Sequence, residues 1–258
     1  MSAVITGETV TDTGRIAVVT GAAGGLGAFV ARRLHAQGHR VVLADIAVDD
    51  ATAVAAELSA DGATAMALEL DVSHKANFEA ALTAIQNVWG TPSIVVNNAA
   101  RTQTADVLTV GEEEFTAVLN TNVNSIFFGC QVFGSAMADN GFGRIVNLSS
   151  LAGQNGGTAT GAHYAASKGA ILTVTKVFAR ELAGKGVTVN AIAPGPLDLP
   201  VFRKTIPADQ VDAMIGGIPV GRLGDPGFVA DMVALLTADN AFFATGACWD
   251  VNGGLYVR

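Results

Sequence analysis

The stretch "RIAVVTGAAGGLG", Arg15 to Gly27, decides the fold, because it joins a strand-like apolar run to a cluster of four glycines. The glycines stand at positions 21, 24, 25 and 27, and a helical segment, "GAFVARRLHAQG", continues from them. A strand, a tight turn and a helix N-terminus in this order predict a βα unit. Glycines at such a turn permit positive φ and let a phosphate approach the backbone amides and the helix dipole. Glycine-rich turns also occur for packing reasons, so the turn alone leaves both interpretations open.

The alternation of strand and helix continues along the rest of the chain. Strand-like runs occupy residues 15–20, 39–45, 63–72, 93–99, 143–150, 186–194 and 247–251, with helical segments between them. This pattern indicates right-handed βαβ crossovers and a parallel sheet. We therefore expect one α/β domain over residues 15–258, a doubly wound (Rossmann) fold whose seven-stranded parallel sheet carries helices on both faces. We expect residues 1–14 to form a flexible arm. Residues 194–227 are irregular and rich in proline, and this pattern predicts a substrate lid.

The composition narrows the class of protein. A chain of 258 residues, half of them hydrophobic and 15% charged, suits a single domain with a buried sheet. A net charge of −8 without any Lys/Arg run argues against nucleic acid as a partner. The N-terminus lacks a signal-peptide pattern and no apolar run would span a bilayer, so we expect a cytoplasmic protein without a membrane partner. Cys130 and Cys248 match no metal spacing; we expect no metal site and interpret both as buried small hydrophobic residues.

Acidic residues close the second and third strand-like runs. Asp45 ends "VVLAD", 24 residues after Gly21, where a carboxylate can bind the ribose diol of an adenosine and repel a 2′-phosphate. No Arg or Lys lies within the turn or next to Asp45, so the sequence favours NAD(H) over NADP(H). Asp71 in "LDVS" could reach the adenine amino group, or act only as a helix cap.

A tyrosine and a lysine one helical turn apart carry the candidate chemistry. Tyr164 and Lys168 in "YAASK" share one helix face, where an ammonium near a phenol lowers the tyrosine pKa. Ser149 and Ser150 follow the run "GRIVN", at the edge where open α/β sheets bind ligands, and a hydroxyl there could polarise a carbonyl. On its own, a Tyr-x-x-x-Lys pair is also a common surface accident.

In combination, these motifs resemble the classical short-chain dehydrogenase/reductase family, from Arg15 almost to the C-terminus. The matching segments are "TGAAGGLG", "LDV", "NNAA", "NTN", "NLSS", "YAASK", "NAIAPGP", "PVGRLGDP" and "TGACWDVNGG". The glycines fit the classical spacing through Gly21, Gly25 and Gly27, and an extended-type spacing through Gly21, Gly24 and Gly27. The short chain, "NNAA" and the lid favour the classical type, which leaves Gly24 where NADP-dependent relatives often place a basic residue. The pattern is most similar to 3-oxoacyl-carrier-protein reductases and related NAD-linked alcohol dehydrogenases.

The resemblance implies four catalytic residues and a cofactor site. Tyr164 resembles the proton donor or acceptor, and Lys168 the residue that lowers the tyrosine pKa and binds the nicotinamide ribose. Ser150, rather than Ser149, resembles the serine that orients the carbonyl, and Asn122 the asparagine that supports a water-linked proton relay to the lysine. The implied NAD site comprises Gly21, Gly25, Leu26, Gly27, Asp45, Ile46, Asp71, Val72, Asn98, Ala99, Tyr164, Lys168, Pro194, Gly195 and Leu197.

Three features depart from the family pattern. Ala100 replaces a usual glycine, which is tolerated if its backbone avoids positive φ. Leu199 replaces a threonine that commonly binds the nicotinamide carboxamide, so this contact must come from backbone such as that of Ile192 or Leu197, or be missing. The spacing from Ser150 to Tyr164 is one residue longer than the pattern.

The resemblance thus implies reversible hydride transfer between NAD(H) and a secondary alcohol or ketone. Candidate substrates are a 3-oxoacyl or 3-hydroxyacyl compound, including acyl thioesters, and a cyclic or other small hydrophobic alcohol. An apolar lid, with Leu197, Leu199, Val201, Phe202 and Ile206, indicates an uncharged or acyl group near the nicotinamide.

Three other classes of protein fit the sequence less well. A sugar epimerase of the extended type needs a second domain, a non-catalytic dinucleotide sensor has no use for the catalytic set, and a methyltransferase needs no Tyr-x-x-x-Lys pair. The family resemblance also implies a homotetramer, with a dimer as the open alternative.

Overall fold

The computed structural model describes residues 14–157, 161–200 and 208–258. Within them, the seven predicted runs form one sheet with the order β3-β2-β1-β4-β5-β6-β7, and every neighbouring pair is parallel. Each strand lies inside its predicted run. The strands are β1 (Ile16–Thr20), β2 (Arg40–Asp45), β3 (Ala65–Glu69), β4 (Ile94–Asn97), β5 (Gly143–Leu148), β6 (Val187–Pro194) and β7 (Cys248–Val251).

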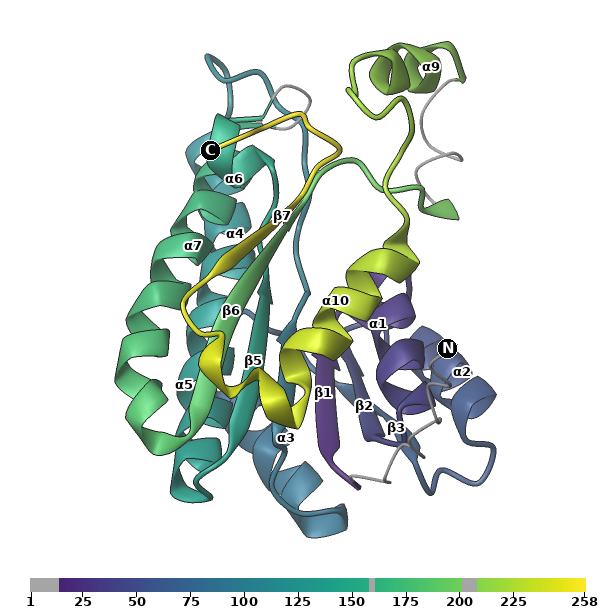
Figure 1. The fold of residues 1–258 in the computed structure, drawn as a ribbon, viewed down its shortest axis with the longest axis vertical. Coiled ribbons are helices and arrows are strands. Elements are labelled where there is room, and N and C mark those ends of the chain that lie inside the picture. Colours follow the sequence, from purple (N-terminus) through teal and green to yellow (C-terminus); the bar gives the residue numbers. More distant parts are fainter. Residues whose placement is uncertain (1–13, 158–160, 201–207) are drawn as a thin grey trace, which may run out of the picture.

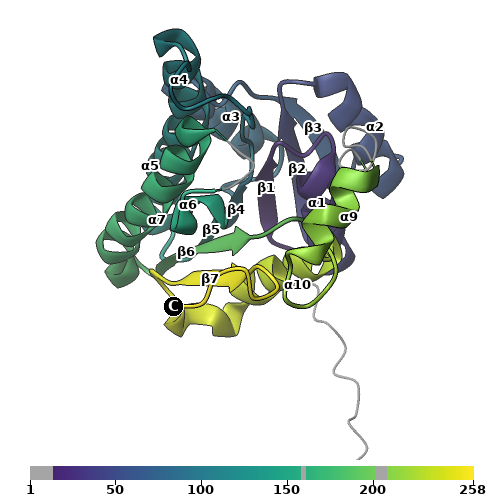
Figure 2. The same ribbon diagram turned by 90° about the horizontal axis from the view of Figure 1, so that it is seen from above.

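Helices cover both faces of the sheet (Figures 1 and 2). One face packs against α1 (Gly25–Ala36), α2 (Val48–Leu58) and α10 (Pro226–Thr237), and the other against α3 (Lys75–Val88), α5 (Ser125–Asp139) and α7 (Ala162–Leu182). The shorter helices are α4 (Glu112–Leu119), α6 (Ala152–Asn155) and α9 (Ala208–Gly216). A π-helical turn, η1 (Asn120–Asn124), joins α4 to α5, and short 3₁₀ helices form at η2 (Ala183–Lys185) and η3 (Asp239–Phe243).

Two apolar cores lie on the two sides of the sheet. Successive strand residues point to opposite faces, so Val19 and Leu43 pack toward α1 and α10, whereas Val18 and Val42 pack toward α3 and α5. Because helices bury both faces, the strands need apolar residues at nearly every position. This explains why the strand runs are continuous in the sequence rather than alternating.

The strand order reverses between β1 and β4, which places a ligand crevice at the carboxyl ends of these strands. From β1 the chain builds outward to β3, and then returns to β4 on the other side. The doubly wound fold is therefore confirmed. Among the described helices, none is both long and apolar enough to pass through a membrane.

Two expectations need correction. The segment 194–227 is not irregular throughout, because α9 forms within it, where Val211 joins Ile218 and Leu223 in a small buried cluster. Cys130 is buried as predicted, but Cys248 is only partly buried, because β7 is the edge strand. The Cys248 thiol lies 3.4 Å from the Asp250 carboxylate. Of the predicted arm and lid, residues 1–13, Val201, Phe202 and Ile206 lie outside the described residues.

Candidate active site

A cleft of about 1030 Å³ opens at the carboxyl ends of the strands, from the glycine turn after β1 to the first turn of α7. Distant parts of the sequence meet there, since the turn and the Tyr-Lys pair line the same space. The predicted site residues that line it are Gly21, Gly25, Leu26, Asp45, Ile46, Asp71, Val72, Asn98, Ala99, Ser150, Tyr164, Lys168, Pro194, Gly195 and Leu197. Gly27 and Asn122 lie behind this lining.

The four glycines of the turn serve different purposes. Gly21 has a φ of +67°, and a Cβ there would come within 2.8 Å of the Ala99 Cα. A Cβ on Gly27 would overlap the Gly21 carbonyl oxygen, so Gly27 permits close packing of helix and turn. Gly25 requires glycine for its φ of +52°, whereas Gly24 has extended backbone with φ −173°. A Cβ on either Gly24 or Gly25 would meet nothing within 4 Å, which leaves this side of the turn open to a pyrophosphate.

The segment after β4 holds the glycine turn in place. The Asn98 side-chain amide donates to the Thr20 carbonyl at 3.0 Å and to the Gly21 carbonyl at 3.1 Å. The Thr20 hydroxyl in turn accepts from the amides of Asn98 and Ala99, both at 3.0 Å. This explains "NNAA" as a clamp across the switch point between β1 and β4. Ala100 has no positive φ, as its substitution for glycine requires.

The two predicted acidic residues differ in their contacts. The Asp45 carboxylate accepts from the amide of Ala23 in the glycine turn at 2.9 Å and from the amide of Ala47 at 3.0 Å. These two bonds hold the carboxylate beside the glycine turn. Asp71 accepts from the Ser73 hydroxyl at 2.6 Å and the Ser73 amide at 2.9 Å, and these bonds lower the pKa of Asp71. Asp71 therefore lines the cleft and also stabilises the turn that leads into α3.

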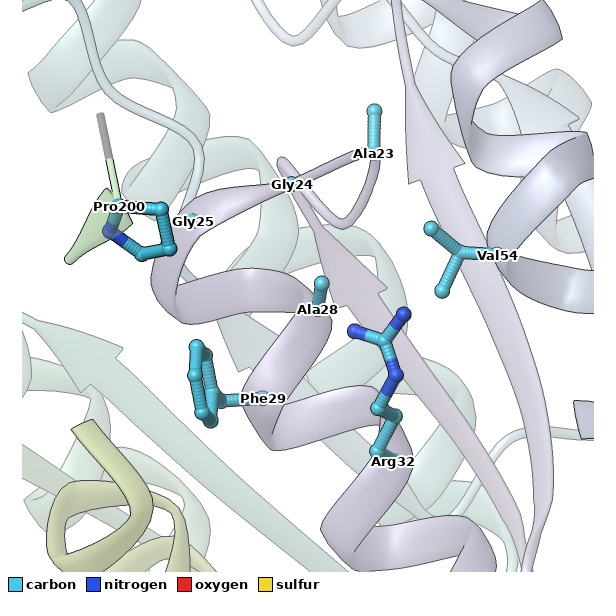
Figure 3. A pocket seen from close by; sticks show the side chains of 8 residues that line it. All are labelled: Ala23, Gly24, Gly25, Ala28, Phe29, Arg32, Val54 and Pro200. Atoms are coloured by element: carbon cyan, nitrogen blue, oxygen red, sulfur yellow. The ribbon is translucent and has the colours of Figure 1, made fainter. Parts of the chain in front are cut away.

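A second, smaller pocket of about 400 Å³ lies on the other side of the glycine turn (Figure 3). Gly24 and Gly25 line both the cleft and this pocket, and Arg32 projects from α1 toward Val54. Arg32 is a basic side chain near the turn that sequence spacing did not reveal. Its guanidinium is paired with the Glu57 carboxylate at 2.5 Å, across α1 and α2.

The Tyr164 phenol meets two hydroxyl groups in the cleft. Ser150, from the loop after β5, and Thr102, from the segment after β4, line the cleft with it, and both side chains act to lower the pKa of Tyr164. Burial raises the pKa of Tyr164, and the hydrogen bonds from Ser150 and Thr102 partly oppose this effect. The sequence suggested that Lys168 would lower this pKa, but burial outweighs the lowering effects.

Lys168 lies below Tyr164, with its Nζ 5.6 Å from the tyrosine ring centre. It donates to the Leu148 carbonyl at 2.7 Å and is 3% exposed, and burial lowers the pKa of Lys168 to about 8. The Ser149 hydroxyl donates to the Lys168 carbonyl at 2.8 Å, so Ser149 anchors α7 to the end of β5. Of the two serines, Ser150 is therefore the one placed beside the phenol.

Asn122 lies inside the π-helical turn and is fully buried. Its side-chain oxygen accepts from the Arg101 amide at 2.7 Å, and its nitrogen donates to the Arg101 carbonyl at 3.1 Å and to the Ser167 hydroxyl at 3.0 Å. The side chain thus fixes the segment after β4 against α7. Nearby, His163 is buried against Glu114 of α4 at 3.1 Å and lies outside the cleft lining.

Sequence reasoning missed part of the cleft lining. Thr102, Thr104 and Thr121 also line the cleft; the first two lie in the threonine-rich run "RTQT" after "NNAA", and Thr121 lies in "NTN". Leu199, which replaces a threonine of the family pattern, also lines the cleft. The wall beside the predicted nicotinamide position is therefore apolar at this residue.

Comparisons with known proteins agree with this geometry. The family described as "Enoyl-(Acyl carrier protein) reductase" matches residues 21–256. The 3-oxoacyl-[acyl-carrier-protein] reductase FabG of Pseudomonas aeruginosa is 37% identical over 244 residues, covering 95% of this chain and 98% of that protein. FabG of Escherichia coli is 35% identical over 246 residues (95% and 98%), and the acetoacetyl-CoA reductase of Shinella zoogloeoides is 38% identical over 245 residues (94% and 98%).

The chain belongs to the short-chain dehydrogenase/reductase family. It is an oxidoreductase that acts on CH–OH and ketone groups with a nicotinamide dinucleotide.

Proposed function

We propose that this protein interconverts 3-oxoacyl and 3-hydroxyacyl thioesters with NAD(H). The observation that carries the proposal is the cleft that Tyr164 and Ser150 line together with the glycine turn and Asp45. The substrate class is supported by the names of the relatives, which are 3-oxoacyl-[acyl-carrier-protein] reductases and acetoacetyl-CoA reductases.

The chain's own residues would position the substrate and manage its proton. The glycine turn and Asp45 would hold NAD(H), which would supply or accept the hydride when bound. The hydroxyls of Ser150 and Tyr164 bind the carbonyl oxygen, where negative charge develops during reduction. Tyr164 gives its proton to that oxygen and is left as phenolate. Lys168 lies close enough to favour this anion electrostatically whenever its ammonium is protonated.

The cofactor preference follows from charge at the ribose end of the cleft. The Asp45 carboxylate is fixed beside the turn and would repel a 2′-phosphate. The basic group of Arg32, close to the same turn, is already paired with Glu57. We therefore propose NAD over NADP, a preference that suits the oxidative direction.

The apolar residues that line one end of the cleft support the proposal of an acyl substrate. Leu197 and Leu199 line it, and both pack with the apolar core. We propose that residues 194–227 form the lid over the acyl group.

The proposal is tested with acetoacetyl-CoA, 3-oxoacyl carrier-protein thioesters and simple cyclic ketones, each assayed with NADH and NADPH on wild type and Tyr164→Phe. We expect turnover of the thioesters with NADH, and a loss of at least about a hundredfold in kcat for Tyr164→Phe, with unchanged NADH binding. Full activity in Tyr164→Phe would overturn the mechanism. Tight NADH binding without turnover of any ketone or alcohol would instead favour the dinucleotide sensor.

We also propose that the protein is a homotetramer that uses the outer face of α5 and α7. Phe127 of α5 is 40% exposed and Val177 of α7 is 48% exposed, and Phe127 packs edge-on against Phe178 at 5.4 Å. Light scattering after size exclusion measures the assembly, and Phe127→Glu should dissociate it. A monomeric wild type would refute this part of the proposal.

A further inference from the structure

The segment between β4 and α4 brings a second hydroxyl, besides that of Ser150, to the Tyr164 phenol. Thr102 lines the same cleft as Tyr164 and Ser150, and its side chain, like that of Ser150, acts to lower the pKa of Tyr164. Neither the glycine turn nor the Tyr-Lys pair predicts this contact, because Thr102 lies far from Tyr164 in the sequence.

Bonds on both sides of Thr102 fix its position. The preceding residue, Arg101, has both its amide and its carbonyl bound by the Asn122 side chain, at 2.7 and 3.1 Å. The following residue, Gln103, accepts at its carbonyl from the amide of Gly161, which caps the N-terminus of α7, at 3.3 Å. The segment is therefore tied to the elements before and beside Tyr164.

The same network reaches the backbone of the tyrosine. Asn122 donates to the Ser167 hydroxyl at 3.0 Å, and Ser167 donates to the Tyr164 carbonyl at 2.7 Å. The buried Asn122 side chain thus fixes both the position of Thr102 and the helical turn that carries Tyr164. A hydroxyl held in this way can act on the phenol without further ordering of the chain.

We propose that Thr102 is a further catalytic residue, whose hydroxyl donates a hydrogen bond to the phenolic oxygen and stabilises the phenolate after Tyr164 has given its proton. The inference rests on the proposed function for its kinetic consequences. In the reductive step the Tyr164 O–H bond breaks, an O–H bond forms on the substrate oxygen, and the charge left on Tyr164 is shared with the hydroxyls of Thr102 and Ser150.

The Thr102 hydroxyl matters because burial disfavours a negative charge on Tyr164. Burial raises the pKa of Tyr164, and Ser150 and Thr102 are the groups that oppose this rise. The Lys168 ammonium is itself disfavoured by burial and donates to the Leu148 carbonyl instead. Hydrogen bonds to an ionised oxygen are about twice as strong as neutral ones, so loss of one hydroxyl should be measurable.

The test compares Thr102→Val, which removes the hydroxyl but keeps the branched shape, with Thr102→Ser, which keeps the hydroxyl. We expect kcat for Thr102→Val to fall about tenfold to a hundredfold, with a smaller change in KM and unchanged NADH binding. Its kcat–pH profile for alcohol oxidation should move to higher pH, and Thr102→Ser should restore both values toward wild type. Thr109→Val, in the same segment but outside the cleft lining, is the matched control.

A direct titration makes the test independent of turnover. The chain has two tyrosines, so in a Tyr256→Phe background the ultraviolet absorbance of phenolate reports Tyr164 alone. Thr102→Val should raise this pKa and Thr102→Ser should not. Unchanged titration and kcat in Thr102→Val would overturn the inference, as would equal losses in both Thr102 variants without any pH shift. Full activity in Tyr164→Phe would instead count against the proposed function.

Discussion

Burial of the Lys168 ammonium lowers the free energy of unfolding, and the size of this effect should depend on pH. The pKa of this lysine is lowered from 10.5 to about 8, because its nearly inaccessible ammonium has lost its hydration. This difference in pKa between the folded and the unfolded chain corresponds to about 3 kcal/mol of unfolding free energy. Below pH 8 the lysine is protonated in both states and the full cost is present. Between pH 8 and 10.5 the folded chain has released its proton and the unfolded chain has not, so stability rises with pH.

Lys168→Met isolates this effect, because most other titrating groups cancel in the difference between variant and wild type. The free energy of unfolding is measured by urea denaturation from pH 7 to 10.5, at fixed protomer concentration and without cofactor. We expect wild type to gain about 3 kcal/mol relative to Lys168→Met across this range. At pH 7 the variant should be the more stable protein, by less than this amount, because it loses the bond to the Leu148 carbonyl.

Lys176→Met is the matched control, since Lys176 is exposed on the same helix. Its difference from wild type should not vary over the pH range in which the Lys168 difference does. A Lys168→Met difference that stays constant from pH 7 to 10.5 would refute the reasoning, because it would mean that the ammonium remains hydrated in the folded protein.

Three further predictions concern the turn, the cofactor and the sheet. Gly27→Ala should lose about 1–3 kcal/mol of unfolding free energy, because its Cβ would overlap the Gly21 carbonyl, whereas Gly24→Ala should fold normally in the same thermal scan. Asp45→Ser should lower the ratio of NAD to NADP specificity by about tenfold or more, and an unchanged kcat/KM ratio would contradict the role of its charge. Arg144→Met should lose about 3 kcal/mol in urea denaturation, because buried Arg144 donates to backbone carbonyls at the ends of β5 and α10. Its kcat per folded protein should stay near wild type, since Arg144 lies at the edge of the sheet opposite the cleft; a large loss of kcat would contradict that placement.

The strands could be predicted because their burial leaves a local trace. Both faces of the sheet are covered, so runs such as β2 must be apolar throughout, and the polar residues that end them mark the cleft edge. Asp45 and Ser150 were predictable for this reason. Asp45 is the polar residue that ends β2, and Ser150 belongs to the serine pair that directly follows β5, where these buried strands reach the crevice.

Features set by tertiary contacts left no such trace. The Thr102 contact depends on an asparagine that binds the neighbouring backbone from a different helix, and nothing in "RTQT" encodes that approach. The pairing of Arg32 with Glu57 depends on how α1 and α2 pack. The direction of the Tyr164 pKa follows from the burial of the whole cleft, which a two-residue motif cannot report.

The π-helical turn between α4 and α5 acts as a rotational offset between two helices that would otherwise be one. Each residue of an α-helix advances the chain by about 100° and 1.5 Å. Deleting one residue from 120–124 would let α4 and α5 run together as one regular helix, and would swing α4 by about that angle around the common axis. Glu114 would then leave His163, and the Asn122 side chain would no longer face the Arg101 backbone. The single extra residue of the π-helical turn thus sets the rotation of α4 relative to α5. This rotation keeps Glu114 beside His163 and Asn122 beside the Arg101 backbone.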